Sequence, residues 1–143
     1  EMRSGWRRRR KKRTAQAKTG QRPFTFNLSL LTSIEMQDLD KIIWRDALTF
    51  VDFFATWCGP CRMMHPVVDR FKQEMQGRVD VYKVDVDDRN TSDFVARYRI
   101  ASVPTLIFFR RGEILWRQSG VIAYEDLKKV LEKLEKTERI EQS

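Results

Sequence analysis

Hydrophobic and polar positions alternate along this chain in patterns that predict both strands and helices. Residues 24–30 place an apolar side chain at every second position, which is typical of a strand. Residues 48–55 form a nearly continuous apolar run, interrupted only by Asp52, which predicts a strand buried on both faces. Three further runs are also predicted to be strands, so that the chain would hold five, at residues 24–30, 48–55, 79–86, 105–109 and 114–118.

Apolar positions at helical spacing occupy the segments between these strands. Thr32 and Ser33 offer an N-cap for the first helix, and Gly77 is expected to end the second. The last two strands are joined by a predicted hairpin turn with Gly112 at its flexible position. Four helices are therefore predicted, at about residues 33–44, 59–76, 92–98 and 124–136.

The order of these elements indicates the α/β class. Strands separated by helices favour parallel pairing with helices over both faces of the sheet, and the closing hairpin adds antiparallel pairing. The pattern therefore predicts a central mixed five-stranded sheet flanked by four helices. No apolar run approaches the roughly 18 residues that would cross a bilayer.

The net charge of +8 is confined to the N-terminal segment. Residues 1–22 hold ten of the 28 Lys and Arg residues and one of the 20 acidic residues, so this segment carries +9 and the remainder −1. Like charges at this density repel each other, and the segment has little apolar surface to offset the entropy of ordering. We expect a disordered basic arm at residues 1–22, one domain at residues 23–138 and a C-terminal tail at residues 139–143.

The basic arm has more than one interpretation. A signal peptide would place an apolar segment after the basic one, but residues 14–20 are polar. We expect a solvated tail, while contact with nucleic acid or with an acidic membrane stays open as the alternative.

Trp57-Cys58-Gly59-Pro60-Cys61 contains the only two cysteines of the chain. Two thiols are too few for a disulfide scaffold, so the fold must depend on its own core. This spacing lets one turn at a helix start bring both sulfurs within bonding reach. Redox chemistry and metal binding are both compatible with the pair, and His65 would supply a third ligand without a fourth.

Further residues make this chain similar to the thioredoxin family. The segment 50–63 is similar to the family's active-site strand and motif, and Pro66 follows at the position of a family helix kink. The resemblance runs from about residue 24 to residue 136 and implies a thioredoxin fold. Other matching positions are Asp52, Lys83, the segment Val103-Pro104-Thr105, Gly112 and Gly120.

The resemblance implies a role for each cysteine. Cys58, at a helix start, would have a lowered pKa because unpaired N–H groups and the helix dipole favour a thiolate there. Cys58 would attack a substrate disulfide, and the more buried Cys61 would resolve the mixed disulfide. Gly59 and Pro60 between them argue for a reductant rather than an oxidant. This interpretation makes a metal site unexpected.

The family also implies roles for residues around the cysteines. Asp52 would be buried with a raised pKa and would take the proton of Cys61, with Lys83 as its partner. Pro104 matches a family proline that follows a cis peptide bond. A flat substrate-docking surface would be formed by Trp57, Gly59, Pro60, Val103, Pro104, Gly120 and Val121.

Two positions depart from the family pattern. Phe54 replaces a tryptophan, which should change fluorescence more than chemistry. His65 stands where the family often has alanine, and we expect it on the helix surface, partly exposed. An influence of His65 on the pKa of the cysteine pair stays open.

The leading hypothesis is a thiol–disulfide oxidoreductase that acts as a general protein-disulfide reductase. Its electrons would come from a thioredoxin reductase-like partner, with no bound cofactor, and its substrates would be disulfide-containing proteins. We expect a cytoplasmic monomer. Two alternatives stay open: a binding or structural subunit of a larger assembly that uses the basic arm, and an exported thioredoxin with a specialised partner, whose upstream signal has been removed.

Overall fold

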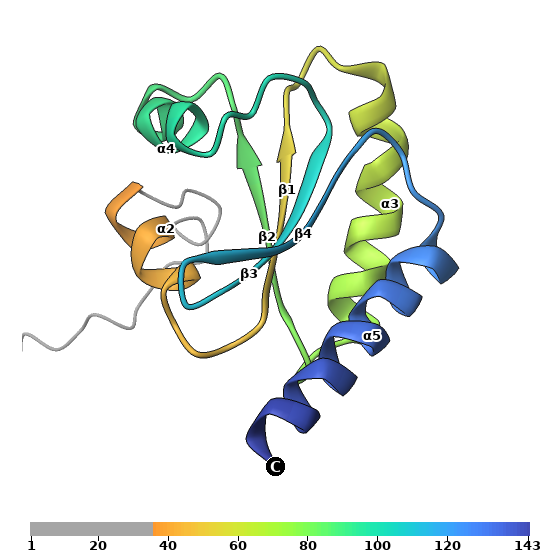
Figure 1. The fold of residues 1–143 in the computed structure, drawn as a ribbon. Helices are drawn as coiled ribbons and strands as arrows, with labels where there is room; N and C mark the ends of the chain where they lie inside the picture. The colour runs from red at the N-terminus through yellow and green to blue at the C-terminus, as the bar shows by residue number, and fades with distance from the viewer. Residues whose placement is uncertain (1–35) are drawn as a thin grey trace, which may run out of the picture. The chain divides into compact units, whose positions relative to one another are not determined.

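The computed structural model describes residues 36–143. Figure 1 shows a sheet between two groups of helices, with α3 and α5 on one side and α2 and α4 on the other. The elements are α2 (Met36–Ile43), β1 (Thr49–Phe54), α3 (Gly59–Glu74), β2 (Asp80–Asp85), the 3₁₀ helix η3 (Arg89–Thr91), α4 (Ser92–Arg97), β3 (Thr105–Arg110), β4 (Glu113–Ser119) and α5 (Tyr124–Gln142).

The sheet is mixed and has the strand order β2-β1-β3-β4. β1 pairs with β2 in parallel, and this pairing requires the crossover that α3 supplies. β3 pairs antiparallel with β1 and with β4. The structure therefore describes four strands where five were predicted, because the predicted strand at residues 24–30 lies outside the described residues, as does the basic arm at residues 1–22.

Successive side chains of β1 point to opposite faces of the sheet, as in any strand. Phe50 packs edge-on against Phe71 of α3, with ring centroids 5.3 Å apart, on the face that α3 and α5 cover. Phe53 stacks on Phe94 of α4 at 5.8 Å on the opposite face. Asp52 has the same parity as Phe50, so the carboxylate of β1 lies on the α3 face.

The C-terminal helix is longer than its pattern predicted. α5 continues to Gln142, so the residues from 139 to 142, predicted to be part of a tail, are helical. The apolar stripe weakens after Leu134, but no Gly or Pro stops the helix. Glu138 also forms an ion pair with Arg110 of β3, 2.9 Å apart, which ties the last turns to the sheet. Of the helices in residues 36–143, none has the length and apolarity to cross a membrane.

The β3–β4 turn places Gly112 in a position that other residues fill poorly. Gly112 has a φ of 77°, and its N–H donates to the carbonyl oxygen of Ile43, 2.8 Å away. A Cβ at this position would come within 2.6 Å of the Trp44 ring. The turn therefore depends both on a left-handed backbone and on the missing side chain.

We expect Gly112→Ala to lower the free energy of unfolding by about 1–3 kcal/mol, because the left-handed backbone costs roughly 1 kcal/mol and displacement of the Trp44 ring adds to it. Urea unfolding measures the loss. Gly77→Ala is the matched control, since Gly77 also has a positive φ, 86°, but a Cβ there meets nothing within 4 Å. Equal losses in the two variants would show that the contact with Trp44 contributes nothing.

Candidate active site

Cys58 and Cys61 lie between the end of β1 and the first turn of α3. The two residues form a disulfide, with their Cα atoms 5.2 Å apart. Cys58 is the N-cap residue of α3, and its Sγ accepts a hydrogen bond from the backbone N–H of Cys61, 3.1 Å away. In the reduced protein the same N–H group and the helix dipole would favour a thiolate at Cys58.

Cys61 is slightly more buried than Cys58. Cys58 is 4% exposed and Cys61 is 0% exposed. Gly59 and Pro60 between them are exposed, and Pro60 in the first turn costs no hydrogen bond because the first N–H groups of a helix have no intrahelical partner. Of the two cysteines, therefore, only Cys58 has any accessible surface.

Asp52 is an unpartnered carboxyl group inside the domain. The residue is 0% exposed, and neither of its carboxyl oxygens has a hydrogen-bond partner. Burial raises the pKa of Asp52 from 3.8 to about 7, although the charge of Lys83 opposes this effect. A carboxyl with that pKa can both take up and release a proton near neutral pH.

Lys83 lies opposite Asp52 in the β1–β2 register, but it does not pair with Asp52. Its ammonium group instead forms an ion pair with Asp69 of α3. This partner differs from the one that the sequence predicted. The long lysine side chain reaches the partly exposed surface, where its charge keeps some contact with water, whereas a pair with Asp52 would have to be fully desolvated. Lys83 therefore acts on Asp52 through space.

The loop before β3 approaches the cysteines from the other side. The peptide bond between Val103 and Pro104 is cis, which confirms the prediction for Pro104. The carbonyl oxygen of Val103 lies 3.6 Å from Cys58 Sγ. Pro104 accepts a hydrogen bond from the N–H of Gly120 at 2.9 Å, which brings the segment after β4 to the same loop.

The predicted docking residues differ in accessibility. Trp57 is 67% exposed, and Gly59, Pro60 and Val121 are also exposed. Val103 and Gly120 are half-buried, and Pro104 is buried, so Pro104 supports the surface rather than presenting itself.

Asp87 orients Trp57 beside the cysteines, and the sequence analysis missed this residue. The indole Nε1–H of Trp57 donates to Oδ2 of Asp87 at 2.8 Å, and the backbone N–H of Asp87 donates to Oδ1 of Asp85 at 2.9 Å. The exposed ring of Trp57 is thus held in one orientation. The available signal was the run of aspartates directly after the predicted strand 79–86, since its parallel pairing with 48–55 places both strand ends at one edge of the sheet.

His65 lies one helical turn after Cys61 and is half-buried, in line with the expectation of partial exposure. Its ring packs edge-on against Phe54, with centroids 5.2 Å apart, and its Nδ1 atom is covered and has no hydrogen-bond partner. Burial, followed by the charge of Lys83, lowers the pKa of His65 below 6.5, so the imidazole is neutral at pH 7.

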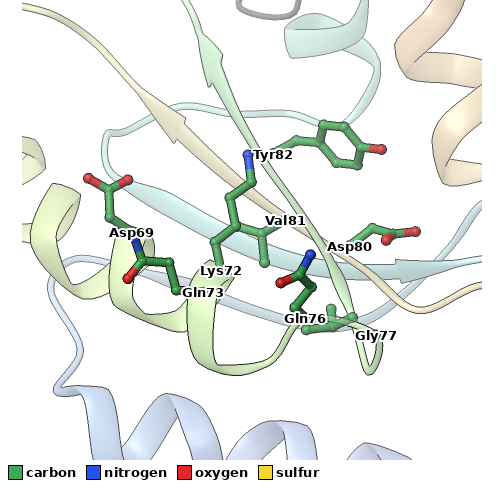
Figure 2. Close-up of a pocket in the computed structure, with 9 residues that line it drawn as sticks. Asp69, Lys72, Gln73, Gln76, Gly77, Asp80, Val81 and Tyr82 are labelled. Carbon is green, nitrogen blue, oxygen red and sulfur yellow. The ribbon is translucent and has the colours of Figure 1, made fainter.

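A separate hollow of about 600 Å³ lies along the C-terminal half of α3 and β2 (Figure 2). Neither cysteine lines it, and it holds no Cys, Ser or His that could act as a nucleophile or a base. In residues 36–143 no group of His, Cys, Asp and Glu has the arrangement of a metal site. The lining residues are Asp69, Lys72, Gln73, Gln76, Gly77, Val79, Asp80, Val81 and Tyr82.

Comparison with known proteins agrees with this geometry. A family model described as Thioredoxin matches residues 31–133. Thioredoxin 1 of Chlorobaculum tepidum is 40% identical over 93 residues, which cover 64% of this chain and 90% of that protein.

Two staphylococcal proteins are similarly related. The thioredoxin of Staphylococcus epidermidis is 37% identical over 103 residues, 72% of this chain and 96% of its own length. The thioredoxin of Staphylococcus aureus is 41% identical over 96 residues, 67% of this chain and 89% of its own length. With its Cys58–Cys61 disulfide at the start of α3, the chain belongs to the thioredoxin family and is a thiol–disulfide oxidoreductase.

Proposed function

We propose that this oxidoreductase is a general protein-disulfide reductase in which Cys58 attacks and Cys61 resolves. The observation that carries the proposal is the unequal burial of the pair at the N-terminus of α3, where only Cys58 has any accessible surface. The site opens on a surface rather than in a pocket, which suits a disulfide carried by another protein.

The first step forms a mixed disulfide. The Cys58 thiolate attacks one sulfur of the substrate disulfide, a bond forms between that sulfur and Cys58, and the substrate's own S–S bond breaks. The second substrate sulfur leaves with the bonding electron pair and takes a proton from solvent.

The second step releases the substrate. The Cys61 thiol gives its proton to the Asp52 carboxylate, and the resulting Cys61 thiolate attacks Cys58 Sγ. The bond between Cys58 and the substrate breaks, and the substrate sulfur leaves with the electron pair. The substrate has then gained two electrons, and the protein is left with its Cys58–Cys61 disulfide.

Docking of the substrate is proposed to involve the residues that surround Cys58. Trp57 and Val121 offer exposed apolar contacts, and the backbone of Val103 beside Cys58 Sγ offers hydrogen bonds to an extended segment. Gly59, Pro60, Pro104 and Gly120 shape the surface between them.

Electrons are proposed to come from a thioredoxin reductase-like partner, with no bound cofactor, in the cytoplasm and with the chain as a monomer. A reductant with Gly-Pro between its cysteines is useful in a reducing compartment, and thioredoxins of bacteria are among its relatives. Fractionation of cells that express the full protein tests the location. Among residues 36–143 no observation favours a purely structural role.

The proposed function is tested by reduction of insulin with dithiothreitol as the electron source. We expect the protein to accelerate the reaction at least about tenfold over dithiothreitol alone, because the N-capping Cys58 is a better nucleophile at neutral pH than a free thiol. The proposal would be refuted if there were no acceleration, or if the protein kept its acceleration after it had been reduced and then alkylated at both cysteines.

A further inference from the structure

His65 and Asp52 both have buried polar atoms that form no hydrogen bond. Within residues 36–143, four buried side-chain polar atoms have no hydrogen bond: both carboxyl oxygens of Asp52, Nδ1 of His65 and one oxygen of Glu138. Glu138 already pairs with Arg110. The other three atoms belong to two side chains at the same interface. Unpartnered buried polar groups are costly, so their concentration beside a reactive pair indicates a use for them.

The geometry of the α3–β1 interface brings the two side chains to one place. Asp52 and Phe54 lie two residues apart on β1 and share the face that α3 covers. Cys61 and His65 lie four residues apart on α3 and share the face that meets β1. Phe54 packs against the Ala55–Cys58–Cys61 cluster and also against the His65 ring. His65 thus adjoins the same Phe54 ring that borders the cysteines.

The charged groups that face the His65 side of the α3–β1 interface lie on α3 and β2. Asp69 lies one turn further along α3, and Lys83 of β2 pairs with it. Both Lys83 and Asp69 act on the pKa of His65 and on that of Asp52. Asp85 of β2, which lies opposite Phe54 in the register, accepts a hydrogen bond from the backbone N–H of Asp87. The ion pair of Lys83 and Asp69 therefore couples the two unpartnered groups electrostatically.

We propose that His65 exchanges the proton of Asp52 with solvent and is thus a positioning residue that acts through Asp52. The inference rests on the proposed function, in which Asp52 receives the proton of Cys61. The half-buried imidazole suits this role because its Nδ1 is turned away from water while another part of the side chain is accessible.

The exchange completes the proton balance of the resolving step. After Cys61 has given up its proton, Asp52 is a neutral acid and must lose that proton before the next cycle. The neutral imidazole accepts the proton at Nδ1, and rotation of the ring then brings the Nδ1–H group to solvent, where this proton is released and the starting tautomer is restored. Asp52 returns to the carboxylate and His65 to the neutral form. We expect a water molecule between the two side chains to relay the proton from Asp52 to His65.

The decisive variant is His65→Phe, which keeps an aromatic ring against Phe54 but cannot carry a proton. We expect its steady-state rate of insulin reduction to fall about tenfold at pH 7–8, because each new cycle must wait for Asp52 to lose its proton; the effect is smaller than for direct proton transfer because His65 does not touch the reacting sulfurs. The difference should disappear near pH 5, where Asp52, with a pKa of about 7, stays protonated in both proteins. Lys72→Gln, on the exposed side of α3, controls for changes in helix charge and should leave the profile unchanged.

His65→Ala provides a second readout, because the space it leaves can admit free imidazole. Added imidazole should restore much of the lost rate in His65→Ala and none in His65→Phe. A His65→Phe protein with the wild-type pH profile would overturn the inference, and so would a His65→Ala protein that imidazole does not rescue.

A double-mutant cycle separates this inference from the proposed function. Because His65 acts through Asp52, His65→Phe should cause no further loss of rate in an Asp52→Asn background.

An NMR titration gives a readout that does not depend on the insulin assay. The ring resonances of His65 should show an inflection near pH 7, and Asp52→Asn should remove it. A full rate in Asp52→Asn alone would refute the role of Asp52. A reduced rate in Asp52→Asn with additive losses in the double variant would refute only the role of His65.

Discussion

Cys58→Ser is expected to reduce insulin no faster than dithiothreitol alone, a loss of at least about a hundredfold in the protein-dependent rate. The hydroxyl that replaces the thiol is not ionised near neutral pH, and among residues 36–143 no side-chain base forms a hydrogen bond with the side chain of Cys58. The helix N-terminus that favours a thiolate at Cys58 has no comparable effect on an alcohol. Turbidity of precipitating insulin follows the reaction.

Cys61→Ser is the matched control for that variant. Cys58 can still attack, but nothing resolves the adduct, so a covalent mixed disulfide with the substrate should accumulate on non-reducing gels. Cys58→Ser should form none, because Cys61 is 0% exposed. Accumulation of equal amounts of adduct in the two variants would contradict the assignment of attacking and resolving roles.

The active site could be predicted from the sequence wherever a residue is held by the backbone or violates a strong pattern. Cys58 and Cys61 are placed by a helix start, and Asp52 interrupts an apolar run that leaves it no polar face. The cis bond before Pro104 was predicted from the family resemblance alone, and the structure has one. For Asp52 and the two cysteines the local chain determines the position of the side chain, so the motif contains the necessary information.

The partners of long or distant side chains could not be predicted in this way. Lys83 has four rotatable bonds, and its choice of Asp69 depends on the relative solvation of two carboxylates from different elements. Asp87 meets Trp57 across 30 residues of sequence, through a loop whose conformation has no periodic signal. The covered Nδ1 of His65 likewise depends on how closely α3 packs on β1.

Fold prediction was limited in a similar manner. Strand and helix positions followed the apolar period, whereas the end of α5 did not, because Arg110 on another element pairs with Glu138. The predicted strand at residues 24–30 falls outside the described residues. The family match over residues 31–133 agrees with the resemblance over that range.

Asp52→Asn is expected to make the protein more stable at alkaline pH while lowering its activity. Asp52 has a pKa of about 7 in the folded protein, in place of 3.8. That difference corresponds to roughly 4 kcal/mol between its two protonation states. The carboxylate therefore destabilises the folded protein above pH 7 by an amount of this order.

The sign follows from proton binding. Between pH 4 and pH 7 the unfolded chain releases the Asp52 proton while the folded protein keeps it, so the folded state binds more protons and stability falls as the pH rises. Below pH 4 and above pH 7 the two states carry the same charge at this position, and its contribution is constant. Asparagine cannot ionise, so the variant should lack this part of the decline.

Urea unfolding at pH 5 and pH 8 measures the effect. At pH 8 we expect Asp52→Asn to be about 2 kcal/mol more stable than the wild type. The substitution removes a penalty of roughly 4 kcal/mol for the buried carboxylate, but a buried amide without hydrogen-bond partners itself costs roughly 1–3 kcal/mol. At pH 5 the gain should be smaller. Asp126→Asn is the matched control, because Asp126 forms an ion pair with Lys129 at the surface of α5, and such pairs contribute about 0–1 kcal/mol.

The same substitution should slow the resolving step, most clearly at pH 7–8, because Cys61 loses its proton acceptor. Stability and activity thus change in opposite directions through one carboxyl group. If Asp52→Asn were no more stable than the wild type at pH 8, the folded pKa could not be raised as far as about 7. If it were more stable but fully active, the proton of Cys61 would have to go to another group. If Asp52→Asn both gains stability and loses rate, then the Asp52 carboxylate destabilises the folded protein and is tolerated because catalysis requires it.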